Sequence, residues 1–280
     1  GKSVAHYALL GLLASPPAAI ENGRAVFDER DLLASSPAQL RRVRGKRISM
    51  IFQDPMTALN PYMRVGTQVI EPLVVHEGCS RAEARRRAIE AFEAVGIVDA
   101  PARIRMHPHE FSGGMRQRVM IAMALITHPE LLIADEPTTA LDVTVQAQIL
   151  ALIRQRQQEL GMAMVLITHD LGVIAGACDR VMVMYAGRIL ESGIARAIFH
   201  DPKHPYTTAL MEALPSVHAA GAPLRTIPGM PPDPTIPMQG CPFAPRCKHA
   251  MPICRTDPCS LEEVDAGHAT ACVRVKRSEL

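Results

Sequence analysis

Two short segments of the chain hold residues that could bind a phosphate group and a metal ion. Gly1-Lys2-Ser3 precedes an apolar helical run and matches the end of the pattern G-x-x-x-x-G-K-[ST]. In that pattern, backbone N–H groups and the lysine cradle phosphate oxygens, and the hydroxyl ligates magnesium. The second segment, 131–136, is an apolar run that ends in Asp135 and Glu136. Carboxylates at a strand end suit a metal ion, held by Asp135 through water, beside a general base, Glu136.

A third segment suits an anion. Ser112-Gly113-Gly114 opens a helical run that extends to residue 125, and a serine with exposed glycine N–H groups at a helix start forms an anion site. An ordinary helix cap would not explain the two glycines, because each costs about 1 kcal/mol within a helix. The first two segments, taken alone, also fit a solvated N-terminus and a solvated acidic turn. Their combination in one chain favours a phosphate site.

These residues need a sheet and helices to position them. Apolar runs typical of buried strands occupy 47–52, 131–135, 162–168 and 181–185. Helical patterns cover 80–96, 112–125 and 142–161, the first of them with a capping box formed by Ser80 and Glu83. Strands that are apolar along their whole length and alternate with helices indicate a parallel sheet covered on both faces. The sequence therefore predicts an α/β fold.

Composition bounds the fold and the partners. The 280 residues suggest about two domains, and the formal net charge of +2 gives no electrostatic support for a nucleic-acid partner. The longest apolar stretch, 4–20, is interrupted by two prolines, and a membrane span needs about 20 uninterrupted apolar residues. Thirteen of the 23 prolines lie in 201–260, and five of the seven cysteines lie in 241–272. The chain therefore changes character near residue 200.

Taken in this order, the motifs resemble those of the ATP-binding subunits of ABC transporters. Residues 111–118, Phe-Ser-Gly-Gly-Met-Arg-Gln-Arg, look like the signature motif of that family, which contacts the ATP bound by the opposite subunit. The resemblance implies ATP and Mg²⁺ as ligands of Gly1-Lys2-Ser3 and Asp135. It also implies a second ATPase subunit, whose ATP faces Ser112-Gly113-Gly114.

Three further residues match functional positions of the family. Gln53, followed by Asp-Pro-Met-Thr-Ala-Leu-Asn-Pro, looks like the glutamine that contacts magnesium and the attacking water. Asp142, in Thr139-Ala-Leu-Asp142, matches a loop that crosses the dimer interface, and His169 matches a histidine that contacts the γ-phosphate. Without the resemblance, Gln53 and His169 fit ordinary polar loop residues, and Asp142 fits a helix cap.

The resemblance implies the fold of the first 200 residues. It is an ABC cassette of the P-loop NTPase class, with a mostly parallel sheet and an inserted helical subdomain at about 57–128. Gly1 matches the last glycine of the phosphate loop, so the first half of that loop and the strands before it do not precede it. We therefore expect the chain to be a fragment of a longer reading frame that lacks its N-terminal strands.

The C-terminal cysteines form a separate module. Cys241, Cys247, Cys254, Cys259 and Cys272 are separated by five, six, four and twelve residues. These gaps do not fit the paired C-x-x-C spacing of zinc sites, whereas thiolates on irregular loops can wrap an iron–sulfur cluster. Composition alone leaves free thiols in a loose tail and a metal site equally open.

Two stretches around this module look like the C-terminal extension of oligopeptide and dipeptide importer ATPases, namely 198–210 and 240–247. The resemblance assigns 201–280 to that extension, with a cysteine-rich module at 240–273. In some members the extension carries a [4Fe-4S] cluster. The ligands implied here are Cys241, Cys247, Cys254 and Cys272, while Cys259 leaves the fourth ligand open.

As a whole, the resemblance implies an ATPase that energises solute import through an ABC transporter, with di- or oligopeptides as the favoured solutes. The implied partners are a second ATPase subunit, two transmembrane permease subunits and an extracytoplasmic solute-binding protein, and the implied location is the cytoplasmic face of the cell membrane. One alternative is an ABC ATPase acting on DNA or ribosomes, but the sequence has neither a coiled-coil insertion nor a tandem cassette. The other is an inert cassette whose cysteine module senses iron or redox state, which the upstream reading frame would distinguish.

Overall fold

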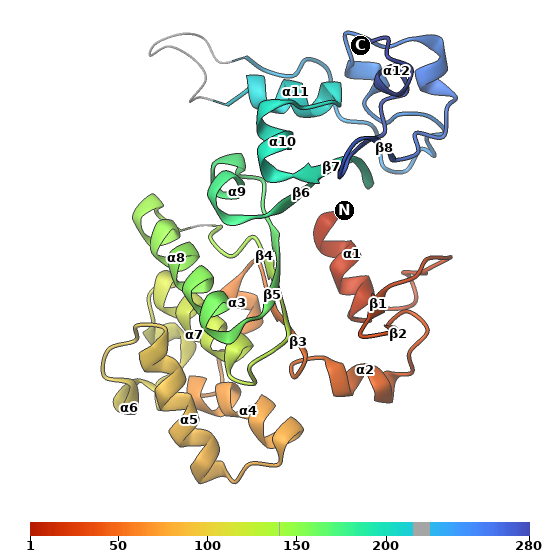
Figure 1. Cartoon of the computed structure of the whole chain (residues 1–280). Coiled ribbons are helices and arrows are strands. Elements are labelled where there is room, and N and C mark those ends of the chain that lie inside the picture. The colour runs from red at the N-terminus through yellow and green to blue at the C-terminus, as the bar shows by residue number, and fades with distance from the viewer. Residues whose placement is uncertain (140, 215–224) are drawn as a thin grey trace. The chain divides into compact units, whose positions relative to one another are not determined.

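The computed structural model describes residues 1–139, 141–214 and 225–280 (Figure 1). The chain packs as two compact units. One comprises Ser3–His169, and the other comprises Asp170–Leu280 together with Gly1–Lys2. Each unit is described by itself.

The unit of residues 3–169 contains the predicted phosphate-site strands and the helical subdomain. Its elements are α1 (Lys2–Leu9), β1 (Val26–Phe27), β2 (Arg30–Asp31), α2 (Pro37–Val43), β3 (Ile48–Ile51), α3 (Pro55–Ala58), α4 (Val65–Glu77), α5 (Arg81–Ala94), α6 (Ala100–Arg103), η1 (Pro108–Glu110), α7 (Gly113–Leu125), β4 (Leu131–Asp135), α8 (Val143–Leu160) and β5 (Ala163–Ile167).

Three strands of this unit form the parallel sheet that the sequence predicts. The order is β3-β4-β5, and both pairings are parallel, with Ile48 opposite Leu131 and Leu131 opposite Ala163. The strands match the predicted runs to within one or two residues at each end. Because parallel strands end at the same edge of a sheet, the residues that follow β3, β4 and β5 gather at one edge.

The helix ends follow from local chemistry. Ser112 caps α7 by accepting a hydrogen bond from Met115 N, and Asp142 caps α8 by accepting one from Val145 N. Ser80 caps α5, but the predicted capping box is only half formed, because the Glu83 carboxylate pairs with Arg86. The two helices around the predicted site therefore begin where the sequence predicts.

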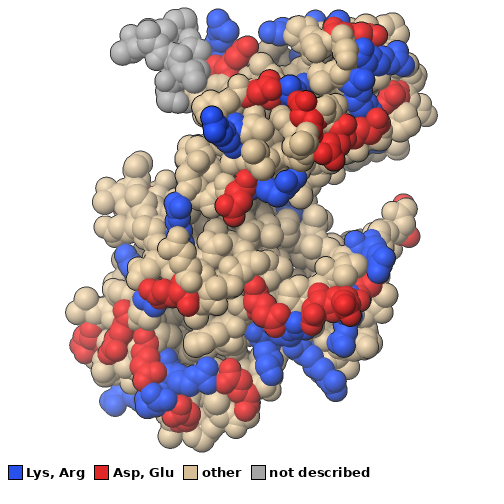
Figure 2. Space-filling view, viewed as in Figure 1, with Lys and Arg blue, Asp and Glu red and all other residues tan. Residues whose placement is uncertain are grey.

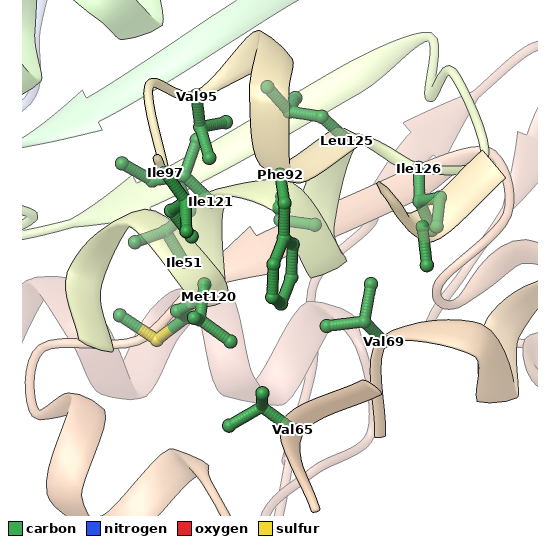
Figure 3. Packing of buried hydrophobic residues seen from close by; sticks show 14 of the residues in the cluster. Ile51, Val65, Val69, Phe92, Val95, Ile97, Met120, Ile121, Leu125 and Ile126 are labelled. Atoms are coloured by element: carbon green, nitrogen blue, oxygen red, sulfur yellow. The ribbon is translucent and has the colours of Figure 1, made fainter. Parts of the chain in front are cut away.

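A hydrophobic core holds the helical part of this unit together. Phe92 of α5 has 0 % exposure and lies in the middle of the side chains drawn in Figure 3. The residues labelled there come from β3, from helices α4, α5 and α7, and from the segments that follow α5 and α7: Ile51, Val65, Val69, Val95, Ile97, Met120, Ile121, Leu125 and Ile126. This packing fixes α7, and with it the Ser112-Gly113-Gly114 segment at its start.

We expect Phe92→Ala to lower the free energy of unfolding by about 3–5 kcal/mol, because the deletion leaves a cavity that the close-packed core cannot fill. Val98→Ala is the matched control, since Val98 is 82 % exposed and surface truncations usually change stability by less than about 0.5 kcal/mol. Urea-induced unfolding of the two variants measures both values. Equal losses in both variants would contradict this description of the core.

The unit formed mainly by residues 170–280 contains a second sheet. Its elements are α9 (Leu171–Ala177), β6 (Arg180–Tyr185), β7 (Arg188–Ile194), α10 (Ala195–His200), α11 (Pro205–Glu212), η3 (Ala244–Arg246), η4 (Pro252–Arg255), β8 (Glu262–Asp265), β9 (His268–Thr270) and α12 (Val273–Lys276). The sheet has the order β6-β7-β9-β8, and all its pairings are antiparallel.

One strand expectation is wrong in its pairing. The run 181–185 does form a strand, β6, but it pairs with β7 in an antiparallel hairpin and does not join the parallel sheet. The cause is the two-residue connection: Ala186 and Gly187 have φ of 46° and 81°. Positive φ at both central residues is the requirement of a type I′ hairpin turn, which forces the next strand to run back alongside β6.

A buried carboxylate joins the segments of this second sheet. Glu191 of β7 has 0 % exposure, and it accepts hydrogen bonds from the backbone N–H groups of Lys203 (2.6 Å) and His204 (3.0 Å). Its other contact is His268 Nε2 of β9, 2.7 Å from Oε1. These bonds satisfy a charge that would otherwise be costly to bury.

The surface charge agrees with the balanced composition. Positive and negative side chains are interspersed over the face drawn in Figure 2. Among the helices that the structure describes, none is long and apolar enough to cross a membrane.

Candidate active site

The carboxyl edge of the parallel sheet brings together residues that lie far apart in the sequence. Gln53 follows β3, Glu136 follows β4 and His169 follows β5. Gln53 Nε2 donates a hydrogen bond to Glu136 Oε2 at 3.0 Å, and His169 Nδ1 lies 3.1 Å from Glu136 Oε1. The three predicted catalytic side chains thus meet at one carboxylate.

The backbone of Glu136 is fixed in an unusual conformation. Its φ is 45°, a left-handed value that few residues other than glycine adopt. Its N–H donates to Ile167 O of β5 at 2.8 Å, which continues the sheet pattern past the end of β4. The Glu136 side chain is 18 % exposed and that of His169 is 72 % exposed. A carboxylate held this way can reach solvent and accept a proton from a water molecule.

Asp135 lies one residue earlier and is closed off from solvent. It has 0 % exposure, and its Oδ1 accepts a hydrogen bond from Ser3 Oγ at 2.9 Å. Its Oδ2 is buried without a hydrogen-bond partner among the described residues. Burial, and then the negative charge of Asp135, raise the pKa of the nearby Tyr7 hydroxyl.

This pair of oxygen ligands fits magnesium. Mg²⁺ is bound by hard oxygen donors and uses one or two carboxylates in addition to phosphate oxygens. The hydroxyl of Ser3 and the carboxylate of Asp135 supply such donors, and the unpartnered Oδ2 leaves a buried negative oxygen for a cation or its water. Of the remaining residues of the phosphate motif, which pack with the other unit, Lys2 begins α1 and Gly1 precedes it.

The side chain of Gln53 also borders a cavity. This open cavity has a volume of about 420 Å³ and is lined by Tyr7, Phe52, Gln53, Asp54, Thr57 and Ala58. A larger cavity of about 820 Å³ lies in the C-terminal unit, and it contains none of the residues predicted for the nucleotide site. The chemistry of the residues, and not cavity size, therefore locates the candidate site.

The Ser112 segment is held by the start of α8. A Cβ atom on Gly114 would lie 3.0 Å from Val145 Cγ1, so only glycine fits there without a shift of that side chain. A Cβ on Gly113 would meet Leu141 Cδ2 at 3.8 Å. Of the segment Thr139-Ala-Leu-Asp142, Ala140 lies outside the described residues. The helix cap by Asp142 and the predicted interface role do not conflict.

The sequence analysis gave no individual role to two residues of this region. Thr139 Oγ1 donates a hydrogen bond to Glu136 Oε2 at 2.9 Å. Gln117 is buried, and its Nε2 donates to Pro137 O at 2.6 Å, which ties α7 to the turn after Glu136. Thr139 could have been found from the sequence, because its hydroxyl lies three residues after the predicted general base, within reach of its carboxylate. Gln117 carried no such signal, because its partner is a backbone carbonyl.

The structure gathers the five C-terminal cysteines around one small cavity, which is also lined by His204 and His249. The backbone N–H groups of His249 and Met251 point at the sulfurs of Cys247 and Cys254, at 3.4 Å each. However, no three metal-ligating side chains come together as a metal site in the described part of the chain.

The surroundings shift the pKa of several thiols in this cavity. A hydrogen bond with Cys259, followed by burial, raises the pKa of Cys241 to about 12. Burial also raises the pKa of Cys247 and Cys272. The sulfur donors have the chemistry of iron–sulfur ligands, but their folded arrangement is that of free thiols, so the predicted cluster stays a prediction.

Comparison with known proteins gives two family matches. The model described as "ABC transporter" matches residues 1–139, and the model described as "Oligopeptide/dipeptide transporter, C-terminal region" matches residues 190–254. The first match includes Ser112 and Glu136 and the second includes Cys241, whereas Asp142, His169 and Cys272 lie outside both.

Relatives and solved structures agree with these matches. The chain is 53 % identical over 278 residues to the oligopeptide transport ATP-binding protein OppD of Salmonella typhimurium, which covers 98 % of this chain and 81 % of that protein. It is 50 % identical to the dipeptide transport ATP-binding protein DppD of Bacillus subtilis, over 91 % of this chain and 76 % of that protein. A dimeric ATP-binding cassette in a post-hydrolysis state with ADP and Pi superposes with a TM-score of 0.61 at 27 % identity, covering 70 % of this chain and 81 % of that chain.

Proposed function

This chain belongs to the family of ATP-binding proteins of ABC-type oligopeptide and dipeptide transporters, and from this premise we propose how its site works. The protein is an ATPase that energises the import of solute, in this family di- or oligopeptides. The observation that carries the proposed mechanism is the convergence of Gln53 and His169 on the carboxylate of Glu136.

Each residue of the site has a proposed role in hydrolysis. Asp135 and Ser3 hold the Mg²⁺ ion, which neutralises charge on the phosphate oxygens when it is bound. Glu136 accepts a proton from the attacking water, and Gln53 orients that water beside the metal site. Lys2 and His169 stabilise the charge on the transferring phosphoryl group, with Gly1 contributing a backbone N–H. The exposed His169 side chain can contact a phosphate without leaving its place after β5.

The second half of the catalytic site comes from another subunit. We propose that Ser112, Gly113 and Gly114 present their N–H groups and hydroxyl to the ATP bound by a second ATPase subunit, and that Asp142 lies at the same interface. The start of α7 favours this role, because a helix N-terminus attracts anions and Gly114 packs closely against Val145 of α8. The second subunit can be a copy of this chain or a related ATPase subunit.

The remaining partners are membrane subunits and a solute-binding protein. The family membership implies transmembrane permease subunits and a dimer of ATPases. We propose two permease subunits contacted by the segment after Gln53, an extracytoplasmic solute-binding protein, and a peripheral place on the cytoplasmic face of the membrane. Residues 1–200 form the ATPase cassette, with the helical subdomain at 57–128, and residues 201–280 form the extension.

The cysteine module carries a separate proposal. We propose that Cys241, Cys247, Cys254 and Cys272 ligate a [4Fe-4S] cluster, with Cys259 as the other candidate for the fourth position. Their shared cavity and the two N–H···S hydrogen bonds support it. Anaerobically purified protein should then contain iron and absorb in the visible range, and protein with neither would end this proposal.

Peptide uptake tests the proposed function. Cells that lack this subunit should fail to take up a labelled tripeptide, and the intact gene should restore uptake. The matched control is the same gene with Asp135→Asn, which keeps the size of the side chain but removes a charge from the metal site. Restoration of uptake by Asp135→Asn, or unchanged uptake without the subunit, would contradict the proposal.

A further inference from the structure

We propose that Thr139 is a positioning residue for Glu136 during ATP hydrolysis, an inference that rests on the proposed function of this site. Thr139 Oγ1 donates a hydrogen bond of 2.9 Å to Glu136 Oε2, and Thr139 N donates one of 3.1 Å to Glu136 O. The two residues therefore form one turn that is closed by its backbone and by its side chains. Thr139 itself is half-buried.

The three residues that contact the Glu136 carboxylate lie at different distances from it in the sequence. Gln53 and His169 approach it from the ends of β3 and β5, 83 and 33 residues away in sequence. In the proposed mechanism, both contact the nucleotide, the metal or the attacking water, so their hydrogen bonds with Glu136 exchange when ATP binds. Thr139 reaches the same carboxylate from three residues away and needs no movement of another segment. Its hydrogen bond can therefore persist through the reaction.

The turn that carries Thr139 is held rigidly. Glu136 N is bound to Ile167 O at 2.8 Å, and Gln117 Nε2 is bound to Pro137 O at 2.6 Å. Gln146 Nε2 of α8 donates to Thr138 O at 3.2 Å. Bonds from β5, α7 and α8 thus fix successive backbone groups of the turn. A hydroxyl on such a turn can hold a carboxylate in one rotamer more tightly than one on a mobile loop.

The position of the hydroxyl suits a general base. Thr139 occupies Oε2, so the other oxygen, Oε1, can accept the proton of the attacking water once His169 turns to the phosphate. Loss of the donor would free the carboxylate to rotate, and a misplacement of about 1 Å can cost about 10²-fold in rate. This effect acts on turnover and leaves ATP binding unchanged.

Thr139→Val tests this inference, because it removes the hydroxyl and keeps the shape. In the assembled importer, we expect kcat for ATP hydrolysis to fall about tenfold at unchanged KM. Thr139→Ser keeps the hydroxyl and should restore kcat. Thr139→Ala replaces the valine variant if that variant does not assemble.

The outcomes separate this inference from the function on which it rests. A wild-type importer with normal ATP turnover, together with a valine variant of equal kcat, would overturn the role of Thr139 alone. A serine variant as slow as the valine variant would do the same, because packing would then be the cause. A wild-type importer that hydrolyses no ATP would overturn both.

Discussion

Glu136→Gln should stop ATP turnover by the assembled importer and leave ATP bound. A positioned general base contributes on the order of 10² to 10⁴-fold in rate, and glutamine cannot accept the proton of the attacking water. The amide has almost the same shape as the carboxylate, so it can keep the contacts with Gln53 and Thr139 at Oε2. ATP binding, which depends on other residues, should persist.

Phosphate release and retained nucleotide measure this prediction together. The importer with Glu136→Gln should release phosphate at least about 10²-fold more slowly than wild type and should co-purify with ATP. Glu130→Gln is the matched control, because Glu130 lies on the surface in an ion pair with Arg47, and surface ion pairs contribute little. Normal phosphate release by the Glu136 variant would remove Glu136 from the mechanism.

Gly114→Asp should have the second largest effect. The new Cβ atom would lie 3.0 Å from Val145 Cγ1, and the carboxylate would place a negative charge at the start of α7, where the partner's ATP is proposed to bind. A negatively charged side chain at this helix N-terminus would repel the phosphate groups that the N-terminus otherwise attracts. Loss of a preorganised anion contact costs on the order of 10² to 10³-fold in kcat, so we expect a decrease of that size.

A neutral variant separates charge from packing. Gly114→Asn has nearly the same size as Gly114→Asp and no charge, so it should lose less activity, and Val145→Ala should relieve the contact in both variants. ATPase assays and thermal unfolding of the four variants measure activity and stability in parallel. If the Asp and Asn variants were equally inactive and Val145→Ala rescued both, the effect would be packing, and the proposed anion role of α7 would fail.

Local signals predicted the elements that hold the site. The caps at Ser112 and Asp142, and the strand that ends at Asp135, lie where the sequence places them, because a cap or a buried strand is specified by residues within a few positions. The roles of Gln53 and His169 came instead from the family resemblance, and the shared carboxyl edge of the parallel strands explains why both lie beside Glu136.

Other features depend on contacts that no local pattern specifies. The β6–β7 hairpin follows from its own turn, but β9 joins this sheet by pairing Thr270 with Glu191 of β7, far away in the sequence. A spacing of three residues allows the Thr139 hydroxyl to reach the Glu136 carboxylate, but it does not by itself predict that hydrogen bond. The cysteine spacing could not show that all five thiols line one cavity, because irregular loops bring them there.

Phosphate release from proteoliposomes is the most direct test of the central claim, that ATP hydrolysis at Glu136 energises peptide import. The vesicles would contain the assembled importer with ATP and Mg²⁺ on the side of the ATPase, and the solute-binding protein with peptide on the other side. The account predicts phosphate release that rises when peptide is added and disappears with Glu136→Gln. Phosphate release that is indifferent to peptide, or that survives Glu136→Gln, would contradict it.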